Sequence, residues 1–258
     1  MTARSASTVR RDAHGAVLVV TIDRPERRNA IDAATAAGLA EAMAVLDDRD
    51  ELSVGIVTGA AGTFCAGMDL KAFLDGERPV IEGKGFAGLV EAPPLKPLIA
   101  AVEGYALAGG CEIVLACDLV VAAEDARFGL PEVKRGLTAA VGGLVRLPRL
   151  IPQHLAMEIA LTGDLVPAPR MAAAGLVNVI TAPGEALSAA LALANKIAGN
   201  APLAVRASKQ VITQSRDWSG RELFERQRAI TSQVNASEDA REGARAFTER
   251  RAPRWSGT

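Results

Sequence analysis

The stretch LIAAVEGYALAGGCEIVLACDLVVAA, residues 98–123, decides the fold class of this chain. Residues 98–102 are apolar and predict a buried strand, Gly104 turns the chain, and a helix is expected to begin near Gly109. Residues 119–123 predict a second buried strand. A strand, a helix and a strand in this order form a right-handed crossover between parallel strands. The stretch therefore predicts an α/β protein with a parallel sheet.

The segments before this stretch continue the same pattern. Two more buried strands are expected at residues 17–22 and 54–58, and Asp32 is suited to cap a helix that reaches about residue 46. Residues 75–88 are rich in glycine, proline and charge, and we expect them to form a mobile loop or lid.

The last third of the chain changes character after Arg149. One strand is expected at residues 177–180, and helices are expected at residues 153–161, 169–174, 185–198, 202–214, 221–235 and 237–250. We therefore predict a core domain of residues 1–195 followed by a helical region of residues 196–258.

Composition and charge limit the classes of function. The 258 residues are 49% apolar and 23% charged, which is enough apolar material for a folded core. The net charge of −1 favours neither a nucleic acid nor an anionic membrane as a partner. The most apolar stretch, residues 98–123, contains Glu103, Glu112 and Asp118, so no membrane span is expected. Residues 1–15 lack the apolar segment of a secretory signal.

The cysteines and histidines argue against disulfides and metal sites. Cys65, Cys111 and Cys117 are few and odd in number, which is typical of a reducing compartment. His14 and His154 have no cysteine or histidine at metal-ligand spacing. We therefore expect a cytoplasmic protein without a bound metal.

Two glycine-bearing turns each follow a strand and open a helix, at FCAGMDL (residues 64–70) and at AGGCE (residues 108–112). A helix N-terminus carries unpaired N–H groups and a partial positive charge, so two such ends that converge can stabilise an oxyanion. Gly109 and Gly110 would let a substrate approach the backbone closely. Either turn alone is more typical of ordinary strand–helix packing.

Two carboxylates lie near the second turn. Glu112 falls in the first turn of the expected helix, where a glutamate often serves only as a cap or dipole partner. Glu132 follows Pro131 and has apolar neighbours, and an apolar setting raises the pKa of a carboxyl group towards neutrality. A surface position in a turn is equally compatible with the sequence around Glu132.

A pair of acids suits the hydration of a double bond. One group takes a proton from water while the other delivers a proton to the α-carbon, and both can hold the same water molecule. Isomerisation of a double bond can run with a single carboxylate that moves a proton between carbons. Glu112 and Glu132 beside one oxyanion hole therefore favour a hydratase over an isomerase.

Four segments in the right order resemble the crotonase superfamily, also called the enoyl-CoA hydratase/isomerase superfamily. They are RPERRNAI (24–31), FCAGMDLKAF (64–73), EGYALAGGCEIVLACDLVVAAEDARFGLPEVKRGL (103–137) and RAFTERRAP (245–253). The chain is most similar to enoyl-CoA hydratases. This resemblance implies an α/β spiral of ββα units whose helical C-terminal region forms trimers or dimers of trimers. It also implies an acyl-CoA substrate and no separate cofactor, because CoA is part of the substrate.

The resemblance assigns roles to individual residues. It places the oxyanion donors at the N–H groups of Met68 and Gly109, water activation at Glu112, and protonation of the α-carbon at Glu132. The family pattern also implies contacts with CoA or substrate at Arg28, Ala30, Ala66, Met68, Asp69, Leu70, Lys71 and Gly110. It further implies that Arg250 reaches the CoA phosphates of its own or a neighbouring subunit.

Three features depart from the family pattern. Met68 stands where many hydratases carry a smaller residue, Ala108 replaces a glycine of the usual triple, and residues 138–143 lack a proline found in many relatives. These changes keep every catalytic group but leave the acyl preference open. The leading hypothesis is an enoyl-CoA hydratase. The alternatives are another crotonase reaction, such as isomerisation or dehydration, and a non-catalytic acyl-CoA-binding protein.

Overall fold

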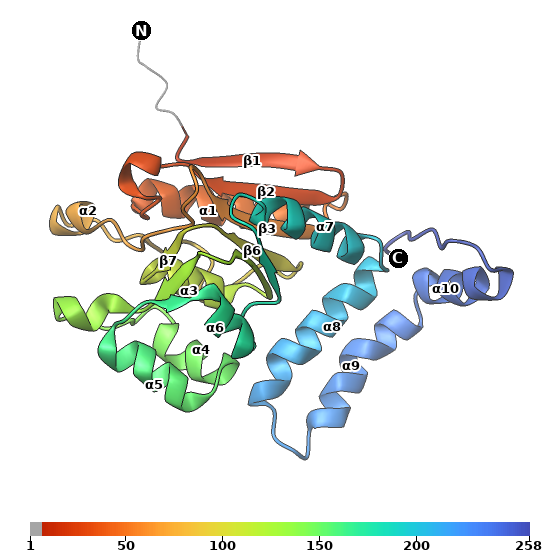
Figure 1. Ribbon diagram of the computed structural model, residues 1–258. Coiled ribbons are helices and arrows are strands. Elements are labelled where there is room, and N and C mark those ends of the chain that lie inside the picture. The colour runs from red at the N-terminus through yellow and green to blue at the C-terminus, as the bar shows by residue number, and fades with distance from the viewer. Residues whose placement is uncertain (1–6) are drawn as a thin grey trace, which may run out of the picture.

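Residues 7–258 are described by a computed structural model, in which strands and helices alternate before a helical C-terminal third (Figure 1). The strands are β1 (Val9–His14), β2 (Val17–Ile22), β3 (Val54–Gly59), β4 (Val80–Ile81), β5 (Gly85–Phe86), β6 (Leu98–Val102), β7 (Tyr105–Leu107), β8 (Leu119–Ala123), β9 (Arg127–Gly129), β10 (Val166–Pro167) and β11 (Val179–Thr181). The α-helices are α1 (Ala33–Asp48), α2 (Leu70–Leu74), α3 (Gly109–Ala116), α4 (Gly143–Leu150), α5 (Gln153–Thr162), α6 (Ala168–Ala173), α7 (Ala186–Ala198), α8 (Pro202–Gln214), α9 (Leu223–Asn235) and α10 (Glu238–Glu249). Short 3₁₀ helices occur at η1 (Pro25–Arg27), η2 (Pro131–Arg135) and η3 (Ser215–Asp217). Part of the segment judged not to be a secretory signal, residues 1–6, lies outside the described residues.

A six-stranded sheet forms the centre of the molecule, in the order β1-β2-β3-β6-β8-β11. β1 pairs with β2 in antiparallel fashion, and all other neighbours are parallel. Every residue of β2 and β6 is buried, as expected for parallel strands with both faces covered. The strands predicted at 17–22, 54–58, 98–102 and 119–123 are confirmed, and the one predicted at 177–180 is observed at Val179–Thr181.

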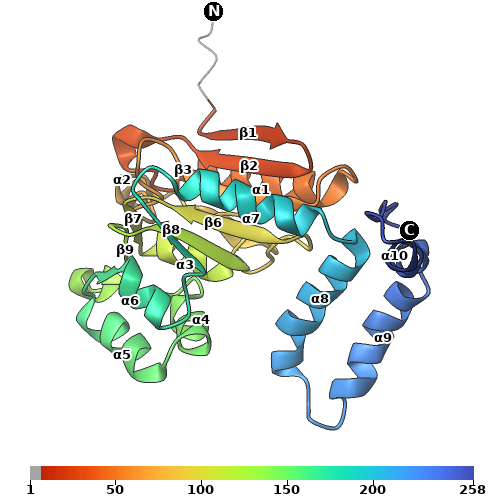
Figure 2. The same ribbon diagram turned by 45° about the vertical axis from the view of Figure 1, so that its right-hand side comes forward.

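Helices cover both faces of this sheet (Figures 1 and 2). On one face, α7 presents Ala186, Ala190 and Ala194 at intervals of four residues to the buried side chains of β2, β3 and β6. Short alanine side chains at this spacing let the helix lie close to the strands. On the other face, α1 and α3 contribute to a larger apolar cluster. The predicted cap of α1 is confirmed, since the Asp32 carboxylate accepts a hydrogen bond from the Thr35 N–H at 2.8 Å.

A small sheet, in the order β10-β9-β7, stands beside the main one and leads to the candidate site. β7 ends just before α3, and β9 ends just before η2, which carries Glu132. Because β7 and β9 pair in parallel, with Leu107 opposite Gly129, both strands deliver their carboxyl ends to the same edge. This pairing explains how segments more than twenty residues apart supply one site.

The prediction of a mobile loop at residues 75–88 is wrong in its second half. β4 and β5 pair as a hairpin, and Phe86 and Ala87 are buried. Phe86 packs against Gly109, so this segment supports the second glycine turn instead of standing free. α4 is not among the predicted helices, because Pro148 lies inside it and proline normally ends a helical pattern.

α8, α9 and α10 form a helical arm that extends from the core (Figure 2). The helices predicted in this region agree with the observed bounds to within two residues, and α7 spans the predicted boundary between residues 195 and 196. Neither α8 nor α9 buries a residue, and Phe224 and Phe247 are largely exposed. A role of this arm in oligomerisation stays a prediction. Within residues 7–258, none of the helices is long and apolar enough to cross a membrane.

Candidate active site

The two glycine turns predicted from the sequence touch each other. Gly67 has a φ of +99°, and a Cβ placed on it would lie 2.8 Å from the Ala108 Cβ and 3.1 Å from the Gly109 nitrogen. The two segments are also joined before the turns, where the Leu107 N–H donates to the Cys65 carbonyl at 3.0 Å. The segments that follow β3 and β7 therefore run side by side up to Gly109.

The N–H groups of Met68 and Gly109 are both free to bind a ligand. The Ile31 N–H donates to the Gly67 carbonyl at 2.8 Å, and the Asp69 N–H donates to the Ile31 carbonyl at 2.9 Å. In this parallel pairing the N–H of Met68 itself points away from Ile31. Gly109 is the first residue of α3, where an N–H has no acceptor within the helix. Among residues 7–258, neither N–H has a hydrogen-bond acceptor.

Close packing at the second turn explains its glycines. A Cβ on Gly110 would lie 2.2 Å from the Cys65 carbonyl oxygen, and a Cβ on Gly109 would lie 2.5 Å from the Phe86 ring. Ala108, where relatives were expected to carry glycine, adopts φ +50° and ψ −127°, a conformation that favours glycine. The turn therefore stores backbone strain of about 1–3 kcal/mol next to the free N–H group.

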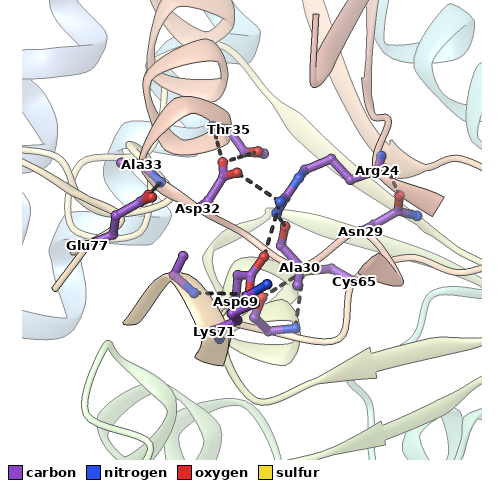
Figure 3. A network of polar contacts seen from close by, with 12 residues as sticks. Arg24, Asn29, Ala30, Asp32, Ala33, Thr35, Cys65, Asp69, Lys71 and Glu77 are labelled. Carbon is purple, nitrogen blue, oxygen red and sulfur yellow. Dashed lines mark hydrogen bonds and ion pairs between the residues drawn. The ribbon is translucent and has the colours of Figure 1, made fainter. Parts of the chain in front are cut away.

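A buried ionic network holds the first turn in place (Figure 3). The Arg24 guanidinium contacts Asp32 at 2.9 Å and Asp69 at 3.1 Å, and it also donates to the Ala30 carbonyl. The Asp69 carboxylate in turn caps α2 by accepting from the N–H groups of Lys71 and Ala72. Burial alone would raise the pKa of Asp69, but these amides and Arg24 lower it. The network thus fixes the backbone on both sides of Met68.

Asn29 connects the loop of residues 24–31 to the segment that follows β3. Its side-chain amide donates to the carbonyls of Ala60 and Thr63 at 2.9 and 2.6 Å, and its side-chain oxygen accepts from the Arg24 N–H at 3.0 Å. Asn29 is fully buried and has a φ of +56°, which asparagine tolerates better than most residues. The loop that contains Ala30 is therefore held rigidly against the turn that contains Met68.

Glu112 is buried in α3, with only 2% of its surface exposed. Its Oε1 accepts hydrogen bonds from the N–H groups of Val141 at 3.0 Å and Gly143 at 2.8 Å. Burial raises the pKa of Glu112 to about 7, the Gly143 amide opposes this rise, and the charge of Glu132 adds to it. A carboxyl group with this pKa can accept or release a proton near neutral pH.

Glu132 lies in η2 and is half-buried. Its Oε2 is one of the buried side-chain oxygens of the described chain that have no hydrogen-bond partner. Burial raises the pKa of Glu132 as well. An unpaired buried carboxyl oxygen is unusual in a folded protein and is typical of a functional site. The parallel pairing of β7 with β9 places the elements that follow them, α3 with Glu112 and η2 with Glu132, at the same edge.

The residues predicted to contact CoA differ in their exposure. The exposed Arg28, Leu70 and Lys71 flank the first turn, and the Arg28 carbonyl accepts from the Ala66 N–H at 3.0 Å. Ala30 and Asp69 are largely buried, with their polar groups taken up by the network around Arg24. Gly110 lies within α3 behind Gly109.

Arg250 is not brought to these turns within the chain. It is the C-cap residue of α10, and both views show α10 beside one end of α9 and away from α2 and α3 (Figures 1 and 2). The contact of Arg250 with the CoA phosphates stays a prediction.

Three contributors to the site were not predicted from the sequence: Arg24, Arg146 and the turn of Val141 to Gly143. The adjacent Gly142 and Gly143 signal a special turn, but nothing local to that turn indicates that its amides bind Glu112. Cys65 and Cys111 lie close to the site and are buried, which raises the pKa of both thiols to about 12 and keeps them protonated. Within residues 7–258 there is no cluster of three His, Cys, Asp or Glu side chains that could hold a metal ion.

Comparison with known proteins covers almost the whole chain. Residues 12–258 match the family described as enoyl-CoA hydratase/isomerase. A carnitinyl-CoA dehydratase of Salmonella arizonae is 41% identical over 260 residues, which are 98% of this chain and 99% of that protein.

Solved structures show the same extent of similarity. An enoyl-CoA hydratase from Mycobacterium tuberculosis is 58% identical with a TM-score of 0.96, over 98% of this chain and 100% of that one. A carnitinyl-CoA hydratase from Mycobacterium avium is 41% identical with a TM-score of 0.78, over the same shares of the two chains. The core and the helical arm are thus both part of the shared architecture.

Proposed function

This chain belongs to the enoyl-CoA hydratase/isomerase family of the crotonase superfamily, and on that premise we propose that it is an enoyl-CoA hydratase. The reaction adds water across the 2,3 double bond of an enoyl-CoA thioester. The main support is one arrangement: the buried Glu112 and the half-buried Glu132 lie on elements that follow the paired strands β7 and β9, and Glu112 stands in the first turn of the helix whose free N–H belongs to Gly109.

In the proposed mechanism, the N–H groups of Met68 and Gly109 bind the thioester oxygen. Glu112 removes a proton from water, and the resulting hydroxide forms a bond to the β-carbon. The electrons of the double bond move to give an enolate, whose negative oxygen is stabilised by the two N–H groups. Glu132, in its protonated form, then delivers a proton to the α-carbon. The pKa of Glu112, about 7, suits proton exchange near neutral pH, and burial of Glu132 favours its protonated form.

We further propose that CoA lies along the first turn. The exposed side chains of Arg28 and Lys71 are placed to meet its phosphates, with Leu70 beside them. Ala30 and Ala66 would contribute backbone and small side chains, which allow a close approach. Arg250 would act from a neighbouring subunit. No separate cofactor is needed, because the reaction only moves water and protons.

The helical arm supports the proposal of a trimer or a dimer of trimers. α8 and α9 bury no residue within the chain, and Phe224 and Phe247 expose large aromatic surfaces. Exposed apolar surface of this kind is typical of subunit contacts. Light scattering after size-exclusion chromatography should give a mass of three or six chains. A monomer at micromolar concentration would contradict this proposal.

A second candidate is dehydration or hydration of a carnitinyl-type CoA thioester. It is favoured by relatives of 41% identity that carry the names carnitinyl-CoA dehydratase and carnitinyl-CoA hydratase. Both candidates use the same proton transfers and differ only in the acyl group. They are therefore separated by substrate preference.

The test is turnover of a panel of CoA thioesters by the purified protein. We expect the enoyl-thioester absorbance of crotonyl-CoA to fall as water is added. Crotonobetainyl-CoA tests the second candidate, and a 3-enoyl-CoA tests isomerisation by product analysis. The exposed Glu124 offers a matched control, because Glu124→Gln should keep full activity while the double variant Glu112→Gln/Glu132→Gln should lose it. Tight binding of all thioesters without turnover would instead indicate a non-catalytic acyl-CoA-binding protein.

A further inference from the structure

The turn of Val141 to Gly143 holds the carboxylate of Glu112 through two amides. Both N–H groups point at the same atom, Oε1, and the residue between them, Gly142, has a φ of +121°. This conformation is strained for any other residue type. The direction of the two amides, and hence the position of the Glu112 carboxylate, therefore depends on what keeps this turn in shape.

Arg146 closes this turn from the first turn of α4. Its backbone N–H donates to the Gly142 carbonyl at 2.9 Å, and its guanidinium lies against the Cα of Gly142, where an added Cβ would be 2.4 Å from Nη1. The same guanidinium donates through Nη2 to the carbonyl of Val90. Arg146 thus connects the turn to the segment that also carries Phe86, the side chain packed on Gly109.

We propose that Arg146 is a positioning residue for Glu112: it locks the Val141–Gly143 turn and places a positive charge beside the carboxylate that this turn binds. This inference rests on the proposed function of Glu112 as the group that activates water. Arg146 itself does not touch the substrate in this mechanism, and it acts only through Glu112.

The charges around the pair support this role. The charge of Glu132 of η2 acts on Glu112, whereas Glu91 after β5 and Arg149 of α4 act on Arg146. The neighbouring thiol of Cys111 is neutral, because burial and the charges of Glu112 and Glu132 raise its pKa. Burial and the charge of Glu132 both raise the pKa of Glu112, whereas Arg146 lowers it. Without Arg146, Glu112 would hold its proton to a higher pH and could not accept one from water at neutrality.

The surroundings of Arg146 make it suitable for substitution. One side of the residue borders a cavity of about 640 Å³ between α3, α4 and α8, which is also lined by Leu115 and Lys209. Shortening the side chain therefore extends an existing space and does not open a new void in the core. Arg149 is the matched control, because it lies three residues on in the same helix and lines the same cavity, with 59% of its side chain exposed.

The experiment measures the titration of Glu112 by infrared spectroscopy, using the protonated-carboxyl band that disappears in Glu112→Gln. In Arg146→Met the midpoint should rise by about one pH unit, the usual effect of losing a neighbouring opposite charge. In Arg146→Lys it should rise less, and in Arg149→Met it should not move. The pH profile of kcat should shift in parallel, with KM nearly unchanged. This titration does not require turnover, so it stays informative if the protein proves not to be a hydratase.

An unchanged midpoint in a folded Arg146→Met protein would overturn the proposal, as would an equal shift in Arg149→Met. If Arg146→Met does not fold, Arg146→Lys decides. Lysine keeps the charge but lacks the fork that reaches Gly142 and Val90 together. Its kcat should therefore fall while the midpoint stays close to that of the wild type, and an unchanged kcat would contradict the proposed role.

Discussion

The two halves of the proposed active site are built in opposite ways. The backbone half consists of the turns at Met68 and Gly109, where buried ion pairs surround the chain and a Cβ added to Gly67, Gly109 or Gly110 would lie less than 3 Å from a neighbouring atom. The carboxylate half consists of Glu112 and Glu132, whose pKa values are raised. Within residues 7–258, the Oε2 atom of Glu132 has no hydrogen-bond partner. A site that binds a fixed negative charge needs rigid donors, whereas groups that move protons must be able to change their own charge. Substitutions in the two halves should therefore affect different properties.

The largest effect is expected in the carboxylate half, on turnover. Glu112→Gln and Glu132→Gln should each lower the rate by roughly 10²–10⁴, the usual contribution of a positioned acid or base. Neither variant should be less stable than the wild type at neutral pH, because in Glu112→Gln the side-chain oxygen of glutamine can still accept from the amides of Val141 and Gly143. Initial rates and thermal unfolding of the same samples check both statements. A rate within tenfold of the wild type in either variant would remove that residue from the mechanism.

The next effect is expected in the backbone half, on stability. Arg24→Met leaves Asp32 and Asp69 without their cation, although their side chains are only 17% and 10% exposed. Breaking a buried ion pair on one side costs about 3–5 kcal/mol, and the slight exposure places this case near 3 kcal/mol. Denaturant unfolding measures the change.

The matched control for Arg24 is Arg10→Met. Arg10 pairs with Asp23 at 2.7 Å, but the two side chains are 52% and 31% exposed. Exposed ion pairs contribute about 0.2–1 kcal/mol, so this variant should be nearly as stable as the wild type. Equal losses of unfolding free energy in the two variants would show that burial does not make the Arg24 network more stabilising than an exposed ion pair.

The same contrast explains what could be predicted from the sequence. The α/β class is confirmed, because runs of apolar residues such as those at 98–102 and 119–123 identify buried parallel strands without knowledge of their neighbours. The crotonase fold, which was expected from the family resemblance, is confirmed as well. The contact between the turns that carry Gly67 and Gly109 was expected only from the family resemblance. The geometry is consistent with that expectation, and the catalytic roles remain proposals.

Contacts between distant segments could not be predicted. Arg24 meets Asp69 across 45 residues, and Glu112 meets Gly143 across 31. No local pattern encodes such pairs, since each partner alone looks like an ordinary surface residue. The burial of Phe86 was missed for the same reason: it lies in a stretch, residues 75–88, that is rich in glycine, proline and charge, while its packing partner is Gly109.

A third prediction concerns the close contacts of the backbone half. Gly110→Ala would place a methyl group 2.2 Å from the Cys65 carbonyl oxygen, so the two turns must separate. We expect a loss of about 2–3 kcal/mol, the upper part of the range for overpacking, despite the higher helix propensity of alanine. Gly220→Ala is the control, because a Cβ there meets no atom within 4 Å. If both variants unfold at the same temperature as the wild type, the turns are more adaptable than their packing indicates.

The smallest effect should separate the halves most clearly, because it depends on pH. Glu112 ionises near 4.5 in an unfolded chain, but burial raises its pKa to about 7 in the fold. Between these values the folded state holds more protons, so stability is greatest at low pH and falls as the pH rises towards 7. The loss amounts to about 1–3 kcal/mol. Glu112→Gln should abolish this part of the pH dependence and become more stable than the wild type above pH 7. The substitution Gly110→Ala does not change a titratable group. Its loss of unfolding free energy relative to the wild type should therefore be the same at pH 5 and pH 8. A loss that changed with pH would mean that the two halves of the site are coupled through α3.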